Sequence, residues 1–158
     1  YKIAHYFGLK IEDVFELSEK LLQATDALTG HAADLGGLPA AHYVNMAGRN
    51  RMLSQRIGKF FLFREWPSLD EKIAVLTPPS CQEFESNLQT LRKTANIPPE
   101  VAAQLRVVAS QWQKFIQTLC PDLSHAARTQ HARLVMAEGE RLLRGVDTTV
   151  KLFERLTK

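Results

Sequence analysis

Apolar residues between positions 101 and 119 constrain the fold more than any other feature of this sequence. They recur at alternating steps of four and three residues: Val101, Leu105, Val108, Trp112, Phe115 and Leu119. That spacing places all six on one face of an α-helix and is typical of a core stripe. No stretch of the sequence alternates apolar and polar residues between turn signals, as β-strands do. The chain is therefore predicted to be all-α.

Breaks in the pattern divide the chain into helices. The first is expected over about residues 3–29, with Gly30 as its end and residues 31–39 as a connector. Its seam has three-four spacing: Val14, Leu17, Leu21, Ala24 and Leu28. The second is expected over about residues 40–66, ended by Pro67.

The second half of the chain continues the same way. Ser80 and Glu83 form a possible capping box for a short accessory helix ending near Lys93. After the Pro99–Leu119 helix, Asp122 or Ser124 can cap a last helix, with this seam: Val135, Gly139, Leu142, Val146, Val150 and Phe153. We predict one domain, residues 1–158, folded as an antiparallel up-down-up-down four-helix bundle with a short accessory helix between helices 2 and 3. That topology would bring both chain termini to one end.

Composition and motifs exclude several function classes. The chain has 158 residues, 45% of them hydrophobic, enough for one domain with a real core. Its net charge is +3, but the arginines are spread along helices without interleaved aromatics, so nucleic acid is not an expected partner. No run of 18 apolar residues and no signal peptide is present. Both ends fit an excised soluble portion of a longer protein or a mature secreted chain.

Chemistry-bearing residues are sparse. The five histidines show no metal-ligand spacing, and no nucleophile or acid-base set shares a helix face, so we expect no metal, no cofactor and no enzyme activity. Cys81 and Cys120 permit one disulfide without arguing for it, because each is expected at a helix end and the turn near Pro98 decides whether those ends meet. The sequence has no CxxC or CxxCH motif, so a redox motif and a c-type haem are not expected.

Residues 45–61 are unusual because they combine four cations and two glycines in a helical pattern. One face is an ordinary core stripe: Met46, Leu53, Ile57, Phe60 and Phe61. The opposite face is a seam of mostly small residues: Val44, Ala47, Gly48, Arg51, Ser54, Gln55, Gly58 and Leu62. Arg51 is thus expected between helices, where it needs an acceptor. Two acceptors stay open: a carboxylate of the chain (Asp26, Glu19 or Asp147) or a bound anion. Arg49 and Arg56 are expected at the surface, solvated or paired.

A faint internal echo links two distant segments. Residues 18–26 and 139–147 share the pattern E-[KR]-L-L-x-x-x-D at an offset of 121. Either the first and last helices have equivalent places in two helical hairpins, or two amphipathic helices share a common pattern by chance.

Residues 45–56 also carry a family resemblance. Asn45-x-Ala47-Gly48-Arg49-x-Arg51-Met52-Leu53-Ser54-Gln55-Arg56 resembles the signature of the PilJ-type N-terminal domain of type IV pilus chemotaxis transducers and related periplasmic proteins. It is also similar to the nitrate-sensing box of NarX-type sensor kinases. A weaker likeness extends over residues 84–91, the Trp112 helix and the E-x-L-L element. We call residues 45–56 the box.

The resemblance implies a periplasmic sensor domain of a transmembrane receptor, with flanking membrane helices outside this segment. It implies a homodimer in which nitrate or a similar small anion binds between two copies of the box. Arg51 matches the principal ligand and Gly48 the point of close backbone approach, while Asn45, Ala47 and Ser54 line the site. Arg suits nitrate because its planar fork of donors matches a planar anion. Arg49 and Asn50 depart from the nitrate kinases, which carry a serine and an apolar residue there.

Overall fold

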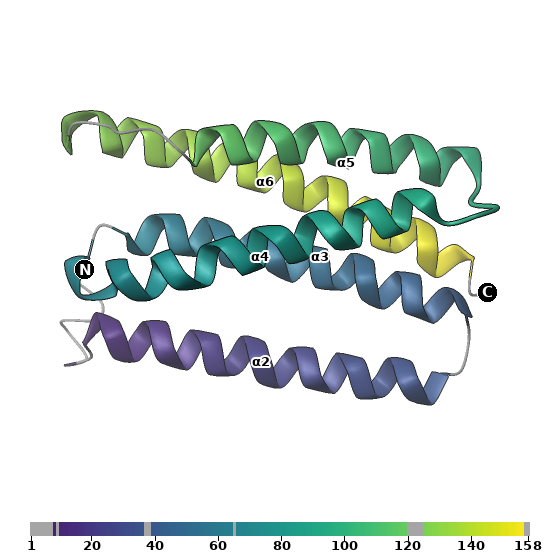
Figure 1. The fold of residues 1–158 in the computed structure, drawn as a ribbon, viewed down its shortest axis with the longest axis horizontal. Coiled ribbons are helices and arrows are strands. Elements are labelled where there is room, and N and C mark those ends of the chain that lie inside the picture. Colours follow the sequence, from purple (N-terminus) through teal and green to yellow (C-terminus); the bar gives the residue numbers. More distant parts are fainter. Residues whose placement is uncertain (1–7, 9, 37–38, 65, 120–124, 157–158) are drawn as a thin grey trace.

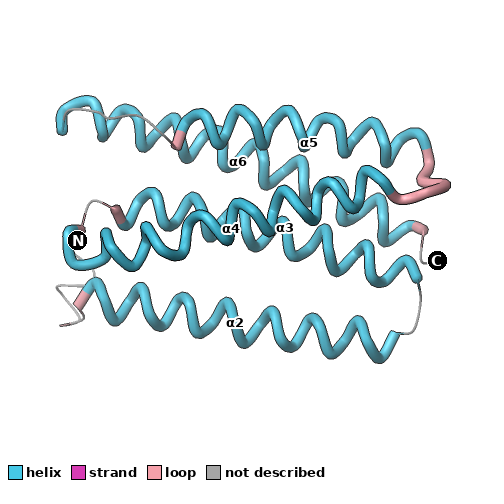
Figure 2. Tube along the Cα trace, in the orientation of Figure 1, coloured by secondary structure: helices cyan, strands magenta, loops and turns pink. Residues whose placement is uncertain are grey.

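Five long helices make up the part of the chain that the structure describes. The structure, a computed structural model, describes residues 8, 10–36, 39–64, 66–119 and 125–156, with the backbone alone for 29–36, 39–40 and 125–130. The helices are α2 (Ile11–Gly36), α3 (Pro39–Phe63), α4 (Pro67–Lys93), α5 (Pro99–Thr118) and α6 (His125–Arg155). They lie side by side, and successive helices run in opposite directions (Figure 1). The part of the chain described contains no strand (Figure 2), which confirms the all-α prediction.

Packing centres on α3. This helix makes its most extensive contacts with α6 and α4, α5 packs mainly on α6, and α4 touches α5. The main core lies among these four helices, and Trp112 of α5 stacks on Phe84 of α4 at a ring-centroid distance of 4.0 Å. The predicted α5 stripe is confirmed from Val101 to Phe115, with every member at most 2% exposed.

The predicted accessory helix is wrong in its length. Instead of beginning at Ser80, α4 begins at Pro67 and runs through Pro78 and Pro79. Both prolines lie on its exposed face, where water can hydrate the carbonyls that lose their N–H partners. Ser80 is buried inside the helix and donates to the Leu76 carbonyl, so it is no cap.

The first helix also differs from expectation. It continues through Gly30 to Gly36, because one glycine costs a helix only about 1 kcal/mol. It packs mainly on α3. With five long helices in the described chain instead of four, α2 begins at one end of the molecule and α6 ends at the other (Figure 1). The start of α2 and the end of α6 are therefore not brought to one end, as the predicted topology required.

The expected seam of α2 does not face the core. Leu17, Leu21 and Leu28 are 59%, 66% and 70% exposed, whereas Phe15 and Glu19 are buried. Phe15 belongs to a small second core, formed by Phe15, Phe60, Leu69 and Ile73. Phe15 and the charged Glu19 thus determine which face of α2 packs on the rest of the molecule.

Two further expectations concern the cysteines and the membrane. Cys81 lies half-buried inside α4 and not at a helix end, and Cys120 lies outside the described residues. Over the described chain, none of the helices combines the length and the apolar character that crossing a membrane requires.

Candidate functional site

The box lies in the middle of α3, and its side chains point in several directions. Ala47, Asn50, Leu53 and Ser54 are buried. Asn50 donates from Nδ2 to the Phe84 carbonyl of α4 at 3.1 Å. Asn50, at a position where the nitrate kinases carry an apolar residue, is therefore buried and hydrogen-bonded, and it is not part of the exposed surface.

Arg49 points away from the exposed seam and joins three helices. Its Nε donates to Glu83 Oε1 of α4 at 2.6 Å, and its guanidinium pairs with Asp26 of α2. The hydrogen bond to Glu83 is the main reason that the pKa of Arg49 is raised above its ordinary value. The positive charge of Arg49, at a position where the nitrate kinases carry a serine, is thus neutralised by two carboxylates.

Arg56 and Lys59 converge on Glu19 of α2. Arg56 Nη2 lies 2.5 Å and Lys59 Nζ 2.6 Å from the Glu19 carboxylate, and all three side chains are at most 19% exposed. Burial by itself raises the pKa of Glu19, but hydrogen bonds from Arg56 and Lys59 outweigh it, and the pKa is lowered overall. Arg49 and Arg56 are therefore paired, which was one of the two expected states, but they lie at a helix interface and not at the surface.

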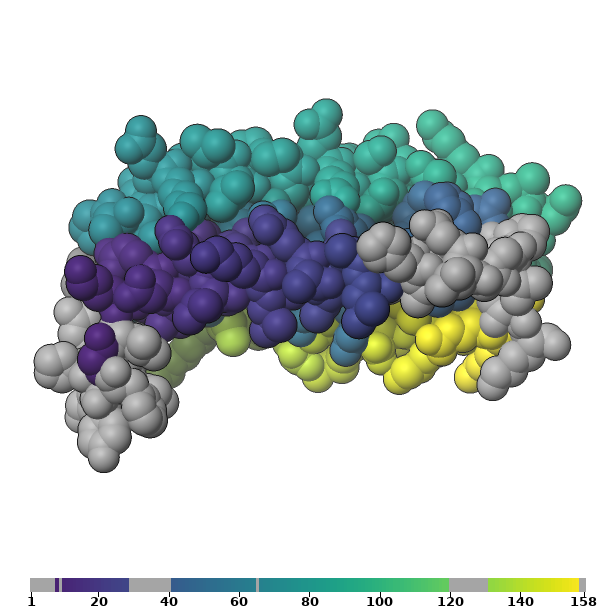
Figure 3. Space-filling model, turned by 90° about the horizontal axis from the view of Figure 1, so that it is seen from below, coloured from purple at the N-terminus to yellow at the C-terminus, as the bar shows by residue number. Residues whose placement is uncertain are grey.

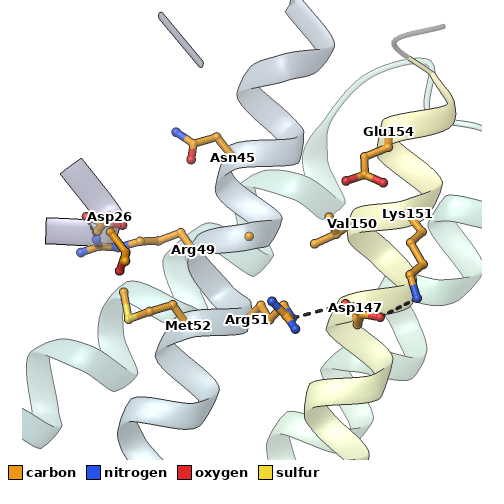
Figure 4. Close-up of a pocket in the computed structure, with 11 residues that line it drawn as sticks. Asp26, Asn45, Arg49, Arg51, Met52, Asp147, Val150, Lys151 and Glu154 are labelled. Carbon is orange, nitrogen blue, oxygen red and sulfur yellow. Dashed lines mark ion pairs between the residues drawn. The ribbon is translucent and has the colours of Figure 1, made fainter. Parts of the chain in front are cut away.

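Arg51 occupies a different environment from the other three cations. Its Nε lies 3.3 Å from Asp147 Oδ1 of α6, and 51% of its side chain is exposed. Lys151 Nζ lies 2.8 Å from the other oxygen of Asp147 and is the main cause of the lowered pKa of that carboxyl. Figure 4 shows Arg49 and Arg51 leaving α3 in opposite directions, toward α2 and α6.

Arg51 projects into an open hollow of about 370 Å³. The hollow lies among three helices and is lined by residues of α2 (Thr25, Asp26), α3 (Asn45, Gly48, Arg49, Arg51, Met52) and α6 (Asp147, Val150, Lys151, Glu154). We call it the Arg51 hollow. Three cations and three carboxylates line it, so its charges balance within one copy of the chain.

The structure brings together three of the five predicted ligand residues. Asn45, Gly48 and Arg51 line the Arg51 hollow, whereas Ala47 is fully buried. Ser54 is 2% exposed, donates to the Arg51 carbonyl at 2.8 Å, and borders a second hollow between α3 and α6. Lys151 was missed by the sequence analysis, although its i, i+4 spacing from Asp147 was a usable signal.

Gly48 has open space above it. A Cβ atom built on this residue would meet no heavy atom within 4 Å in the described structure. Glycine inside a helix is destabilising relative to alanine. Internal packing thus gives no reason for a glycine at this position.

The two segments of the internal echo flank α3. Asp26 of α2 and Asp147 of α6 both line the Arg51 hollow. Their leucines differ, because Leu142 is fully buried while Leu21 is 66% exposed. The two helices therefore supply equivalent carboxylates without equivalent packing.

Comparisons with known proteins point to one family. The family model for the N-terminal domain of type IV pili methyl-accepting chemotaxis transducers, PilJ, matches residues 37–142, about two thirds of the chain. The match begins just before α3 and ends inside α6, so α2 lies outside it. Neither curated proteins nor solved structures yield a match. With its box on α3, the chain belongs to the PilJ family, the N-terminal sensor domains of chemotaxis transducers.

Proposed function

We propose that this chain is the periplasmic ligand-binding domain of a bacterial transmembrane receptor, and that it binds nitrate or a similar small anion between two copies of the box. In this proposal the chain is one domain, and α3 to α6 form its up-down four-helix unit. The observation that carries it is the state of Arg51. Arg49 and Arg51 both line the open hollow, but Arg49 is 28% exposed and held by two carboxylates, whereas 51% of the Arg51 side chain is exposed and it pairs with Asp147.

The Arg51–Asp147 pair suits an exchange of counter-ions. A half-exposed ion pair contributes only about 0–1 kcal/mol, so an incoming anion can replace Asp147 at small cost. The planar guanidinium can then donate two parallel hydrogen bonds to a planar acceptor such as nitrate. Because Asp147 lies on α6, the replacement alters a contact between α3 and the last helix.

A second copy supports selectivity for an anion. The charges of one Arg51 hollow balance, so a single copy has little preference for negative ligands. Two Arg51 guanidiniums facing each other would repel, and an anion between them would remove that repulsion. The open space over Gly48 allows a partner backbone to come close. Ligand would then change dimer geometry, which a receptor can transmit as a helix shift.

Thermal unfolding tests the proposal directly. Nitrate, nitrite, chlorate and small organic anions are screened for an increase in melting temperature, which binding to the folded state produces. The increase should be lost in Arg51→Ala and kept in Arg144→Ala, whose arginine is also exposed and paired but lies outside the Arg51 hollow. No shift with any anion at millimolar concentration would contradict the proposal.

The second candidate function is a structural or protein-interaction module without a small ligand. The ion pair from Arg51 to Asp147 favours it, because an internal carboxylate already serves the guanidinium. Asp147→Asn separates the two functions. If Asp147 competes with a ligand, this variant should bind nitrate about fivefold more tightly, which corresponds to about 1 kcal/mol. If the pair is purely structural, stability should fall with no gain in nitrate binding.

A further inference from the structure

Asp147 is held by two cations at once. Its Oδ1 lies 3.3 Å from Arg51 Nε on α3, and its Oδ2 lies 2.8 Å from Lys151 Nζ on its own helix, α6. Figure 4 shows Asp147 between the two cations, with a dashed line to each. If an anion replaces Asp147 at Arg51, as the proposed function requires, this carboxylate therefore still has a partner.

The two ion pairs of Asp147 differ in what holds them together. Asp147 and Lys151 form an i, i+4 pair on one helix, the spacing at which opposite charges meet on a helix surface. The pair with Arg51 joins two helices, so its length depends on how α3 and α6 sit. The hydrogen bond from Lys151 is the main reason that the pKa of Asp147 is lowered, whereas Arg51 acts on it through its charge alone. Of the two contacts, the one to Arg51 is therefore the easier to give up.

Without Lys151, a displaced Asp147 would oppose the ligand. Asp26 and Glu154 also line the Arg51 hollow, so three carboxylates belong to the space that receives the anion. Like charges within one hollow repel each other. Lys151 reduces this repulsion because it keeps Asp147 paired on the α6 side of the hollow.

Solvent reaches all three side chains of this arrangement. The exposed fractions are 51% for Arg51, 35% for Asp147 and 65% for Lys151. Figure 3 shows the C-terminal part of α6, in yellow, on the face of the molecule that α2 crosses. Exposed ion pairs contribute little to stability, so their partners can be exchanged without unfolding this part of the chain.

We propose that Lys151 is a positioning residue of the anion site, which retains Asp147 on α6 when an anion takes the place of this carboxylate at Arg51. The inference rests on the proposed function and deepens it. It assigns a role to a residue outside the box and outside residues 37–142, the region matched by the family model. Binding then exchanges an ion pair between α3 and α6 for one within α6, so occupancy of the site changes the contact between two helices.

A double-mutant cycle on nitrate affinity, measured by isothermal titration of the whole chain, tests the inference. Lys151→Met should weaken nitrate binding about threefold, because Asp147 is then held by Arg51 alone. In the Asp147→Asn background the same change should alter the affinity by less than about 1.5-fold, because no carboxylate remains to be held. Lys151→Arg should restore the wild-type affinity, because it keeps the charge.

Arg144→Met is the matched control. Arg144 also forms an i, i+4 ion pair on α6 but lies outside the Arg51 hollow, so its loss should leave the nitrate affinity unchanged. Thermal melts followed by circular dichroism verify that every variant stays folded.

The outcomes separate this inference from the proposed function. An equal loss of affinity from Lys151→Met in both backgrounds would make Lys151 a direct ligand, and it would overturn the positioning role while the anion site stands. Unchanged affinity in Lys151→Met would also overturn that role. Nitrate binding that is absent from wild type, or that survives Arg51→Ala, would instead contradict the proposed function and the inference with it.

Discussion

The two sides of α3 carry the same types of cation in different environments. Toward α2, Arg49, Arg56 and Lys59 are at most 28% exposed and are held by carboxylates at hydrogen-bonding distance. Toward α6, Arg51 is 51% exposed and its nearest carboxylate oxygen is 3.3 Å away. The first side has the features of a structural interface, and the second has those of a surface where the counter-ion can be exchanged.

Exposure and the number of carboxylate partners separate binding cations from structural ones on a basic helix. A cation held by buried carboxylates would leave those charges uncompensated on changing partner, which is strongly destabilising. A cation in one solvent-exposed ion pair loses only about 0–1 kcal/mol of stabilisation on changing partner. By this criterion only Arg51, within residues 45–61 of the described chain, is available to a ligand.

Removing the buried acceptor should have the largest effect on stability. Glu19→Ala leaves Arg56 and Lys59 without their carboxylate, and we expect a loss of about 2 kcal/mol, below the range for fully buried pairs because both cations can reach water. Chemical denaturation of the variant measures this loss. Glu16→Ala on the same helix is the control, since its exposed pair with Lys72 should be worth less than about 1 kcal/mol. Equal losses in the two variants would remove the contrast between the interfaces.

Acid should weaken the same contact. The folded-state pKa of Glu19 is lowered from its ordinary value of 4.5. Its contribution is therefore complete above about pH 4.5 and is lost as the pH falls through the lower folded-state pKa. Between neutral pH and pH 3, the free energy of unfolding of wild type should fall more than that of Glu19→Gln. Parallel pH profiles would contradict the assignment.

A smaller effect of opposite sign is expected at Gly48. Gly48→Ala should stabilise the single chain by about 0.5–1 kcal/mol, because the helix gains propensity and the new methyl group meets open space. Gly145→Ala is the contrasting variant, since its Cβ would collide with the Gln111 side chain. Thermal melts at a concentration where the chain is monomeric compare the two. Destabilisation by Gly48→Ala would show that the space over Gly48 is already occupied.

How far the sequence predicts this fold depends on what each helix packs against. The α5 stripe was predicted correctly because its apolar members, spaced from Val101 to Phe115, all face the core. The α2 stripe has the same spacing and is exposed. Periodicity identifies an apolar face but not its partner, and here Phe15 and Glu19 determine which side docks. The length of α4 was missed because Ser80 and Glu83 have the spacing of a capping box, whereas Pro67, expected only to end the preceding helix, also begins α4.

The candidate site was predicted in outline and revised in detail. The box, Arg51 and Gly48 were identified from spacing and resemblance, and Arg51 and Gly48 line one hollow with Asn45. Ala47 and Ser54 are buried instead, since the core face of α3 is wider than the apolar residues alone indicate. The carboxylates that pair with Arg49 and Arg56 lie on α2 and α4, far from them in the sequence. The local sequence pattern therefore could not predict these pairs.

Isothermal titration with nitrate of wild type, Arg51→Ala, Arg56→Ala and Arg144→Ala shows whether Arg51 is the anion ligand. Arg51 should behave as the exchangeable cation and Arg56 as a structural one. Nitrate binding should be lost in Arg51→Ala and unchanged in Arg144→Ala. Arg56→Ala should keep the nitrate affinity while losing stability. Nitrate affinity that survives Arg51→Ala, or that depends equally on Arg56, would contradict these roles of the two arginines.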